Sequence, residues 1–531
     1  MIVRKQLFNR DVKVYNDRPK TVSEMFEATV REYPQKEALI MGEVRQTYKQ
    51  VNDTAITIAK NLFYNYKIEK GDRVAILVEN CLEFVHVLLA CAKLGAVIVP
   101  LNSRLSVQEI TFMLNHSNAK ALITEKGYYE KLQLVHEDQQ LTSTKVFFII
   151  DEYDSNNLTL VKSFSVLNAN VGEKSFPKID IEETDPLFIM YTSGTTGTPK
   201  GAIGSHVGII HSALNYKHVM NTNETIKTLI AIPLFHVTGL IGQLIHMTLV
   251  GGTSVILKRY RTEEYLKTME TEKINFLFNV PTIYVMLLSS PHFKKAAYND
   301  VSIIAYGGAP MSYETIYQLR REFPNARLHN AYGATETSSP TTLMPIYYPD
   351  SKASSVGLPV PVAEIKVVNE EGEELATNEV GELLIKGPMV IEGYWDNPKA
   401  NNETFVNGFW KSGDLAMIDD DGYVYIMDRK KDMINRGGEK IYSAEVENVI
   451  YGHLGVLEAA VVGIPDQLFG EQVKAYIVTK NEYSVTAEDI QSYLSDKLAD
   501  YKIPKEIEFL NELPRNPGGK VLKTILSKLN Q

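Results

Sequence analysis

The stretch that decides the fold spans residues 186–201 and reads PLFIM followed by YTSGTTGTPKG. The apolar run predicts a buried strand, and the remainder predicts a loop rich in hydroxyls and glycine. Polyphosphate binding needs backbone N–H groups that approach closely, hydroxyl donors and a cation. The loop is not a Walker A motif, because a proline separates its second glycine from the lysine. On residue chemistry alone, a surface loop without a ligand stays open as the alternative. The expected phosphate-binding residues are Thr192, Ser193, Gly194, Thr195, Thr196, Gly197 and Lys200.

On both sides of this loop, short β-branched runs alternate with helical patterns such as Glu79–Lys93 and Val107–His116. Strands that alternate with helices predict parallel sheets covered by helices. The expected strands lie at 73–77, 96–101, 121–124, 146–150, 228–234, 253–257, 274–280 and 301–308.

After about residue 355 the pattern changes to short strands joined by acidic or glycine turns, as in 364–375 and 421–428. This pattern is typical of antiparallel sheets. The charged run Asp428–Asp432 then precedes a compact α+β pattern. We therefore predict an α/β fold with a large N-terminal domain of helix-covered, mostly parallel sheets plus a small β-barrel-like part, followed by a small α+β C-terminal domain. The expected bounds are 1–428 for the first domain, 429–432 for a hinge and 433–531 for the second.

The composition excludes several classes of protein. A net charge of -10 disfavours nucleic acid and anionic membrane surfaces as main partners. The two cysteines, Cys81 and Cys91, lie in an apolar stretch and predict inert buried thiols in a reducing, cytoplasmic setting. The apolar stretch Leu240–Leu257 is interrupted by polar residues and predicts buried core, so we expect no integral membrane segment.

Six motifs, in order, resemble those of the adenylate-forming superfamily of acyl-CoA synthetases, firefly-type luciferases and peptide-synthetase adenylation domains. The resemblance runs from about residue 25 to the end of the chain. The motifs are TSGTTGTPKG (192–201), AYGGAPMS (305–312), NAYGATET (330–337), KSGDLA (411–416), DRKKDMINRGGEKIYSAEVE (428–447) and PRNPGGKVLK (514–523).

The resemblance implies ATP, Mg²⁺ and coenzyme A (CoA) as ligands, with a small carboxylic acid as substrate. Glu336 would hold Mg²⁺, and Thr335 would touch the α-phosphate. Asp414 would accept hydrogen bonds from the ribose, assisted by Arg429. The remaining expected nucleotide residues are Gly308, Ala309, Pro310, Asn330, Ala331, Tyr332, Gly333 and Ile426.

The C-terminal motifs imply a mobile domain. Lys520 is the expected catalytic lysine, because an ammonium on a flexible loop suits a group that must arrive and leave. Lys431 is the aligned hinge residue, and Gly437 and Gly438 would line the channel for the pantetheine thiol. Asp428 stands where the family commonly has glycine.

The motif PLFHVTG (233–239) matches the acyl pocket of the family, with His236 as an expected catalytic residue; a satisfied core histidine is the alternative. The matched walls carry no charged residue, which favours an apolar acid, and a medium- or long-chain fatty acid first. We expect Gly239, Gly242, Gly307 and Gly308 to leave room for the chain. An aryl acid, such as a benzoate-like or o-succinylbenzoate-like one, an adenylation enzyme that loads a separate carrier protein, and a non-enzymatic scaffold are the alternatives. A homodimer is left open.

Overall fold

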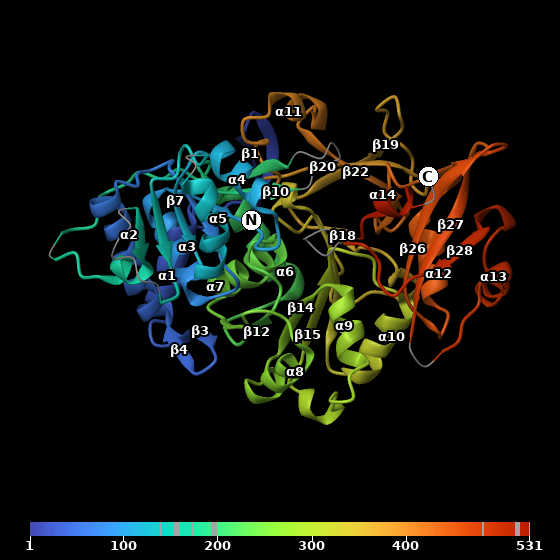
Figure 1. Cartoon of the computed structure of the whole chain (residues 1–531), viewed down its shortest axis with the longest axis horizontal. Coiled ribbons are helices and arrows are strands. Elements are labelled where there is room, and N and C mark those ends of the chain that lie inside the picture. The colour runs from blue at the N-terminus through green and yellow to red at the C-terminus, as the bar shows by residue number, and fades with distance from the viewer. Residues whose placement is uncertain are drawn as a thin grey trace.

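The computed structural model describes residues 1–137, 140–152, 160–172, 174–192, 199–480, 483–515 and 521–529. Helix-covered sheets make up most of the molecule, and a smaller sheet built from the C-terminal residues lies at its far right end in Figure 1. The predicted fold class is confirmed.

The first large sheet is parallel except for the pair β10–β11, which flanks the expected phosphate loop. Burial of Leu187–Met190 on both faces explains why PLFIM is a strand. In the described residues its seven strands lie in the order β11 (Lys200–Ser205), β10 (Pro186–Thr192), β6 (Val97–Pro100), β5 (Arg73–Leu77), β7 (Ala119–Thr124), β8 (Val146–Ile149) and β9 (Val161–Ser163).

The second large sheet has a parallel centre and antiparallel edges. Its strands β15 and β16 carry two of the nucleotide motifs at adjacent positions. In the described residues the nine strands lie in the order β18 (Leu358–Pro359), β17 (Thr342–Leu343), β16 (Arg327–Tyr332), β15 (Ile303–Gly307), β14 (Phe276–Asn279), β12 (Lys227–Ile230), β13 (Thr253–Ile256), β3 (Glu37–Met41) and β4 (Val44–Thr47).

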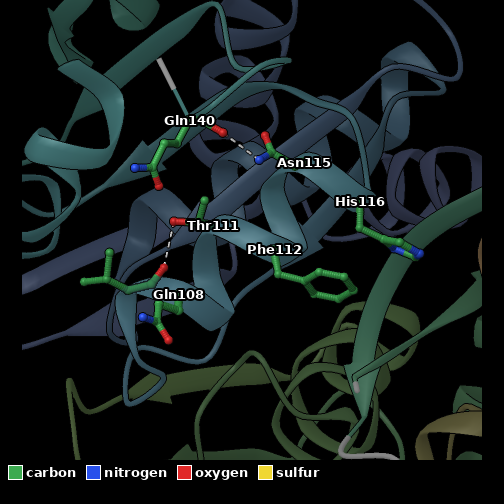
Figure 2. Close-up of a pocket in the computed structure, with 7 residues that line it drawn as sticks. Gln108, Thr111, Phe112, Asn115, His116 and Gln140 are labelled. Carbon is green, nitrogen blue, oxygen red and sulfur yellow. Dashed lines mark hydrogen bonds between the residues drawn. The ribbon is translucent and has the colours of Figure 1, made fainter. Parts of the chain in front are cut away.

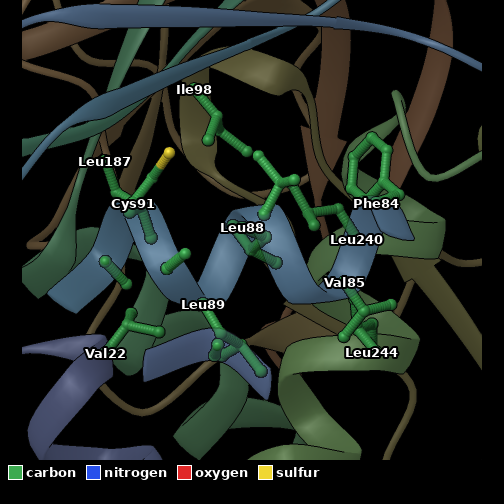
Figure 3. Close-up of a cluster of buried hydrophobic side chains, with 14 of the residues drawn as sticks. Val22, Phe84, Val85, Leu88, Leu89, Cys91, Ile98, Leu187, Leu240 and Leu244 are labelled. Atoms are coloured by element: carbon green, nitrogen blue, oxygen red, sulfur yellow. The ribbon is translucent and has the colours of Figure 1, made fainter. Parts of the chain in front are cut away.

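A layer of helices separates the two large sheets. Helix α3 (Leu82–Leu94) shares one core cluster with Ile98 of β6 and Ile230 of β12. Figure 3 shows its Leu88 and Cys91 directed towards Ile98 and Leu187, while Val85 points to Leu244. A helix that is apolar on all sides is expected where both faces are covered. The prediction began this helix at Glu79; it begins at Leu82 after an extended Cys81 and ends at Gly95, which adopts a left-handed φ of 66°.

The other helices of this part follow local signals. Helix α4 has the predicted bounds, because Ser106 and Glu109 form a capping box at its start. The helices are α1 (Val22–Glu32), α2 (Tyr48–Tyr66), α4 (Val107–His116), α5 (Lys126–Glu137), α6 (His206–Met220), α7 (His246–Val250), α8 (Thr262–Thr271), α9 (Pro281–Leu288), α10 (Tyr313–Glu322) and α11 (Pro398–Thr404).

Two smaller antiparallel sheets complete this part of the chain. A hairpin of β1 (Ile2–Leu7) and β2 (Arg10–Tyr15) stands at the N-terminus. The predicted antiparallel strands after residue 355 form a second sheet, whose long strand β22 carries Asp414. The strands of this second sheet are β19 (Glu364–Val368), β20 (Gly381–Lys386), β21 (Phe405–Val406), β22 (Phe409–Ile418) and β23 (Val424–Arg429).

The C-terminal residues form a separate sheet with its own core of Ile434, Val461, Ile477 and neighbouring residues. Its strands are β24 (Ile434–Arg436), β25 (Glu439–Ile441), β26 (Val456–Asp466), β27 (Gly470–Thr479) and β28 (Glu506–Phe509). The helices of this part are α12 (Ser443–Tyr451), α13 (Ala487–Ser495) and α14 (Lys523–Leu526). The bounds of the two predicted domains and of the hinge remain predictions.

The stretch Leu240–Leu257 is core, as predicted. It is divided between a π-helical segment, η2 (Thr238–Ile245), then α7 and β13. Among the described residues, every helix is too short or too polar to span a bilayer. Cys81 and Cys91 are both buried, and burial raises the pKa of each thiol. The prediction of inert buried thiols is confirmed.

Candidate active site

The expected ribose residues meet at the junction of two sheets. Asp414 on β22 and Arg429 on β23 are cross-strand partners, and the Arg429 Nε lies 2.8 Å from Asp414 Oδ1. The hydroxyl of Tyr332, the last residue of β16, donates to Asp414 Oδ2 at 2.5 Å. Burial, and next the charge of Asp414, hold the pKa of Tyr332 well above its ordinary value, so the phenol stays a donor. The structure therefore brings Tyr332, Asp414 and Arg429 together.

Glu336 lies one turn further along the chain, in the short 3₁₀ helix η4 (Thr335–Thr337). Its Oε1 accepts hydrogen bonds from Thr192 Oγ1 at 3.3 Å and from the Tyr394 hydroxyl at 3.0 Å. Within the described residues, Oε2 has no donor. Two donors on one oxygen fix the plane of the carboxylate and leave the other oxygen available to a ligand.

The two ends of the phosphate loop face each other. Thr192 and Lys200 are cross-strand partners in the β10–β11 pair. Lys200 Nζ lies 5.3 Å from the centre of the Tyr394 ring. Thr192 and Lys200 thus flank Glu336 and its tyrosine partner. The expected residues Ser193, Gly194, Thr195, Thr196 and Gly197 fall outside the described residues.

The expected adenine side is formed by the ends of β15 and β16. Gly308 has φ +80°, and a Cβ on it would be in ordinary contact with Val280 Cγ1 at 3.7 Å; Gly308, Ala309 and Pro310 are exposed. Ala331 pairs with Gly307, and the Asn330 side chain donates to Ser355 O at 3.0 Å. Three other expected nucleotide residues lie nearby in sequence or in a sheet. Gly333 packs closely on the backbone of 339–340, and Thr335 lies in η4. Ile426 is the cross-strand partner of Ala416.

The prediction that four glycines leave room for an acyl chain is wrong at three of them. A Cβ on Gly242 would lie 2.7 Å from the Phe278 ring, and one on Gly239 would lie 2.8 Å from Pro233 O. A Cβ on Gly307 would lie 2.2 Å from Ala331 O. These glycines admit neighbouring atoms of the protein, so the space beside them is already filled. His236 is half-buried and precedes η2, and its ring is tilted by 58° against that of Phe235, with ring centres 4.7 Å apart.

Of the expected C-terminal residues, the structure describes those near the hinge. Lys431 is exposed in a turn, where the Asp432 amide donates to Arg429 O at 2.9 Å. Gly437 and Gly438 are exposed and have positive φ, and the Gly437 amide donates to Phe469 O at 2.8 Å. Lys520 falls outside the described residues. The residues on either side of its loop, Arg515 and Val521, form an antiparallel bridge.

A polar cluster that the sequence analysis missed joins the two sides of the predicted hinge. Asp428 at the end of β23 accepts from the Ser443 amide at 2.5 Å and from the Ser443 hydroxyl at 2.8 Å. Lys523 Nζ donates to Ser443 Oγ at 2.6 Å and pairs with Glu447 at 2.6 Å. Burial raises the pKa of both Asp428 and Glu447, although Lys523 opposes this. The signal in the sequence was Asp428 itself, at a position where glycine is common in the family.

No cluster of three or more His, Cys, Asp or Glu side chains suited to a metal occurs among the described residues. Mg²⁺ does not need one, because it is commonly bound by one or two carboxylates together with substrate phosphates and water. The open Oε2 of Glu336 is a hard oxygen ligand of this kind.

A surface groove of about 580 Å³ runs along α4 and is separate from these residues. Figure 2 shows Phe112 and His116 on one side of it and Gln140, which accepts from Asn115, on the other. His116 is hydrogen-bonded through Nδ1 to the Tyr191 hydroxyl at 2.8 Å. One lining residue of the groove is thus bonded to the strand that leads into the phosphate loop, and none of the lining residues is an expected site residue.

The comparisons with known proteins agree with this geometry. The AMP-binding enzyme model matches residues 26–395, and the model of the AMP-binding enzyme C-terminal domain matches 445–520. The long-chain-fatty-acid–CoA ligase FadD13 of Mycobacterium tuberculosis is 34% identical over 91% of this chain and 93% of its own. A feruloyl-CoA synthase of an Amycolatopsis species is 32% identical over 92% and 95%. The solved o-succinylbenzoate CoA synthetase (MenE) of Bacillus subtilis, in complex with its acyl-adenylate OSB-AMP, is 29% identical over 96% and 98%, with a TM-score of 0.80.

The chain belongs to the AMP-binding enzyme family, within the adenylate-forming superfamily. It is an AMP-forming acid–thiol ligase, an ATP-dependent acyl-CoA synthetase.

Proposed function

We propose that this synthetase activates a carboxylic acid with an uncharged, apolar tail. Glu336, Asp414 and Lys520 would have the roles that the motifs imply. The carboxylate of the acid would attack the α-phosphorus of ATP and expel pyrophosphate, which gives acyl-AMP. The thiol of CoA, losing its proton, would then attack the acyl carbonyl and expel AMP. Such a reaction asks the protein to position the groups and to neutralise charge. The observation that carries the proposal is the Glu336 carboxylate, held at Oε1 by Thr192 and Tyr394 beside the phosphate loop.

The residues around Glu336 fit a magnesium ion. Oε2 is open within the described residues, and the neighbouring Thr192 hydroxyl is a second hard oxygen. Bound there with phosphate oxygens, Mg²⁺ would neutralise charge that builds up on the leaving pyrophosphate. Thr192 and Lys200 would bind the same phosphates from the loop side. Asp414 would hold the ribose hydroxyls, with Arg429 fixing the orientation of its carboxylate.

The proposed catalytic lysine is Lys520, whose ammonium would stabilise the attacking carboxylate and the α-phosphate. We propose that the C-terminal domain carries it into place about a hinge at 429–432, with Lys431 as hinge residue. Rotation of the same domain would then present Gly437 and Gly438 to the pantetheine thiol. A short linker between units with separate cores supports such a motion.

The test compares Lys520→Ala with Lys528→Ala, an exposed lysine on the same segment. Lys520→Ala should lose acid-dependent ATP–pyrophosphate exchange by a factor of about 10³ or more, as loss of a charge-stabilising group does, while ATP binding by calorimetry is retained. Lys528→Ala should keep full exchange. Wild-type exchange in Lys520→Ala would contradict the assigned role.

The acid is proposed to be a medium- or long-chain fatty acid. Support comes from the uncharged walls around Phe278 and Tyr306 and from the 34% identity to FadD13. An aryl acid is the second candidate, because the filled space at Gly239 and Gly242 favours a compact acid. A panel of saturated acids of increasing length and of hydroxylated and plain aryl acids, with CoA and ATP and pyrophosphate release as readout, separates them. A preference for dicarboxylic acids would contradict the proposal that the acid has an apolar tail.

A further inference from the structure

We propose that the N-terminal hairpin and the segment Val390–Trp395 form a positioning frame for Glu336, in which Tyr394 and Arg10 are positioning residues. Tyr394 holds the carboxylate directly, and Arg10 holds the segment from outside. This inference rests on the proposed function, because it takes Glu336 as the magnesium ligand. It assigns roles to residues that lie outside the six motifs.

Tyr394 links the two sides of the phosphate site. Its hydroxyl donates to Glu336 Oε1 at 3.0 Å, and Lys200 Nζ lies 5.3 Å from its ring centre. The residue is only 4% exposed. Its amide donates to Asn401 Oδ1 at 2.7 Å, and its carbonyl accepts from Asn401 Nδ2 at 3.2 Å. These contacts fix the backbone of Tyr394 on α11 and its ring beside Lys200, and so they fix the position of the hydroxyl at Glu336 Oε1.

The backbone of the same segment also binds the site. The Ile391 amide donates to the carbonyl of Glu336 at 2.9 Å. The Trp395 amide donates to Gly201 O at 2.8 Å, and the Ile203 amide donates to Gly393 O at 3.1 Å. Segment Val390–Trp395 therefore ties η4, which carries Glu336, to β11, which begins at Lys200.

Arg10 contacts this segment through its backbone carbonyls. Its guanidinium donates to Ile391 O and to Glu392 O, both at 2.9 Å, and lies 4.8 Å from the centre of the Phe405 ring. The residue is 8% exposed, and burial lowers the pKa of Arg10 to about 10, which leaves it charged at neutral pH. A charged donor that bridges two consecutive carbonyls restrains both peptide planes.

The turn of the hairpin directs the Arg10 side chain towards the segment Val390–Trp395. Phe8 and Asn9 both have positive φ, at 52° and 58°, and connect Leu7 to its cross-strand partner Arg10. A two-residue turn of this kind fixes the register of the hairpin and hence the side on which Arg10 lies. A groove of about 550 Å³, lined by Arg10, Glu392 and Phe405 among others, opens on this side of the segment. Arg10 therefore contacts the segment where the segment borders solvent.

Arg10 lies before the part of the chain that the family model matches, which begins at residue 26 and includes the segment Val390–Trp395. Arg10 contacts this segment through backbone carbonyls, whereas the Tyr394 side chain contacts Glu336 directly.

The test measures ATP affinity by calorimetry with Mg²⁺ and with EDTA, and takes the ratio. Glu336→Gln should abolish the Mg²⁺-dependent gain. Tyr394→Phe should reduce the gain by about 10-fold or more, as the loss of a residue that orients a metal ligand commonly does. Arg10→Met should reduce it in the same direction by a smaller factor. In pyrophosphate exchange, both variants should raise the Mg²⁺ concentration needed for half-maximal rate.

Matched controls remove a similar group elsewhere. Tyr48→Phe deletes a buried hydroxyl that donates to Met247 O and Gly252 O, and Arg4→Met deletes an exposed arginine of the same hairpin. Both should keep the wild-type ratio. If Arg10→Met does not fold, Arg10→Lys retains the charge but lacks the planar fork that donates to Ile391 O and Glu392 O from two different nitrogens. Faster hydrogen exchange at the Glu336-bonded Ile391 amide is then the expected result.

The outcomes separate the two proposals. If Glu336→Gln loses the magnesium effect while Tyr394→Phe and the Arg10 variants keep it, the positioning frame is wrong and the proposed function stands. If Glu336→Gln keeps the effect, the magnesium role of Glu336 itself fails. If Tyr48→Phe lowers the ratio as much as Tyr394→Phe, the effect reflects general loosening, and the frame is again wrong.

Discussion

The hydroxyl of Tyr332 donates to the carboxylate of Asp414 across 82 residues of sequence, at 2.5 Å. Tyr332 ends a strand of the second large sheet, and Asp414 lies in the middle of β22 in a different sheet. The contact therefore couples two sheets at the place where the ribose is proposed to bind. Arg429 on the other carboxylate oxygen completes the arrangement.

Asp414→Asn should raise the KM for ATP more than it lowers kcat. The amide cannot pair with Arg429 and loses one acceptor for the ribose. Hydrogen bonds to charged groups contribute about 1.5–3 kcal/mol each, so a rise of roughly 10- to 100-fold is expected. Steady-state pyrophosphate release at varied ATP measures it. Asp420→Asn, on the β22–β23 turn, should leave the KM unchanged, and an unchanged KM in Asp414→Asn would remove the ribose role.

Ser443→Ala should loosen the contact that crosses the predicted hinge. It removes the hydroxyl that Asp428 accepts and that Lys523 contacts, and it leaves a buried carboxylate poorly paired. A cost of about 1–3 kcal/mol is expected. Lys430 and Lys431 are exposed between the two partners, so trypsin cleavage there should become several-fold faster than in wild type. Ser495→Ala, an exposed serine on α13, serves as control; equal cleavage of the two variants would contradict the coupling.

Acid should unfold the N-terminal domain through its buried histidines. Burial lowers the pKa of His86 from 6.5 to about 4, so the unfolded chain takes up its proton first. The contribution of His86 to stability is complete above pH 6.5 and is lost as the pH falls towards 4. Four other buried histidines, His206, His211, His246 and His329, behave in the same way.

The variant His86→Gln removes one of these titrating side chains, so its comparison with the wild type gives the contribution of His86 alone. Between pH 6.5 and pH 5 the wild type should lose about 2 kcal/mol more unfolding free energy than this variant, at 1.36 kcal/mol per pH unit. Urea unfolding at the two pH values measures the difference. The exposed His292, changed to Gln, should keep the wild-type pH dependence. Parallel curves for wild type and His86→Gln would show that His86 is charged in the folded state.

Gly307→Ala should destabilise the protein strongly, because its Cβ would lie 2.2 Å from the carbonyl oxygen of Ala331 on the neighbouring strand. Relief requires β15 and β16 to separate, and a loss of about 3 kcal/mol or more in unfolding free energy is expected. Gly127→Ala, in α5 with open space around it, should cost nothing and could add up to about 1 kcal/mol. Equal stability of the two variants would refute the close packing.

Local signals in the sequence predicted much of the fold and part of the site. The helical pattern of 107–116 placed α4 to the residue, and the apolar runs placed the central strands. The sequence could not distinguish a glycine that leaves a gap from one that admits a neighbour, which is why Gly239, Gly242 and Gly307 were misread.

Other site features were missed because they depend on tertiary contacts. Tyr394 and Arg10 contact residues that are far away in sequence, and no charge pattern marks them. The roles of the site residues, including Glu336, Asp414 and Lys520, stay predictions.

The two buried cysteines have a practical consequence for testing the proposed motion of the C-terminal domain. With Cys81 and Cys91 buried and their thiol pKa values raised, neither is a ready target for a thiol-reactive spin label. New cysteines can therefore be labelled in the otherwise natural sequence. Glu370 and Lys440 are exposed and their charged groups lie 4.0 Å apart, on opposite sides of the predicted hinge. A nitroxide pair at these two positions would report, by its dipolar spectrum, each state that the enzyme visits as ATP, acid and CoA are added in turn.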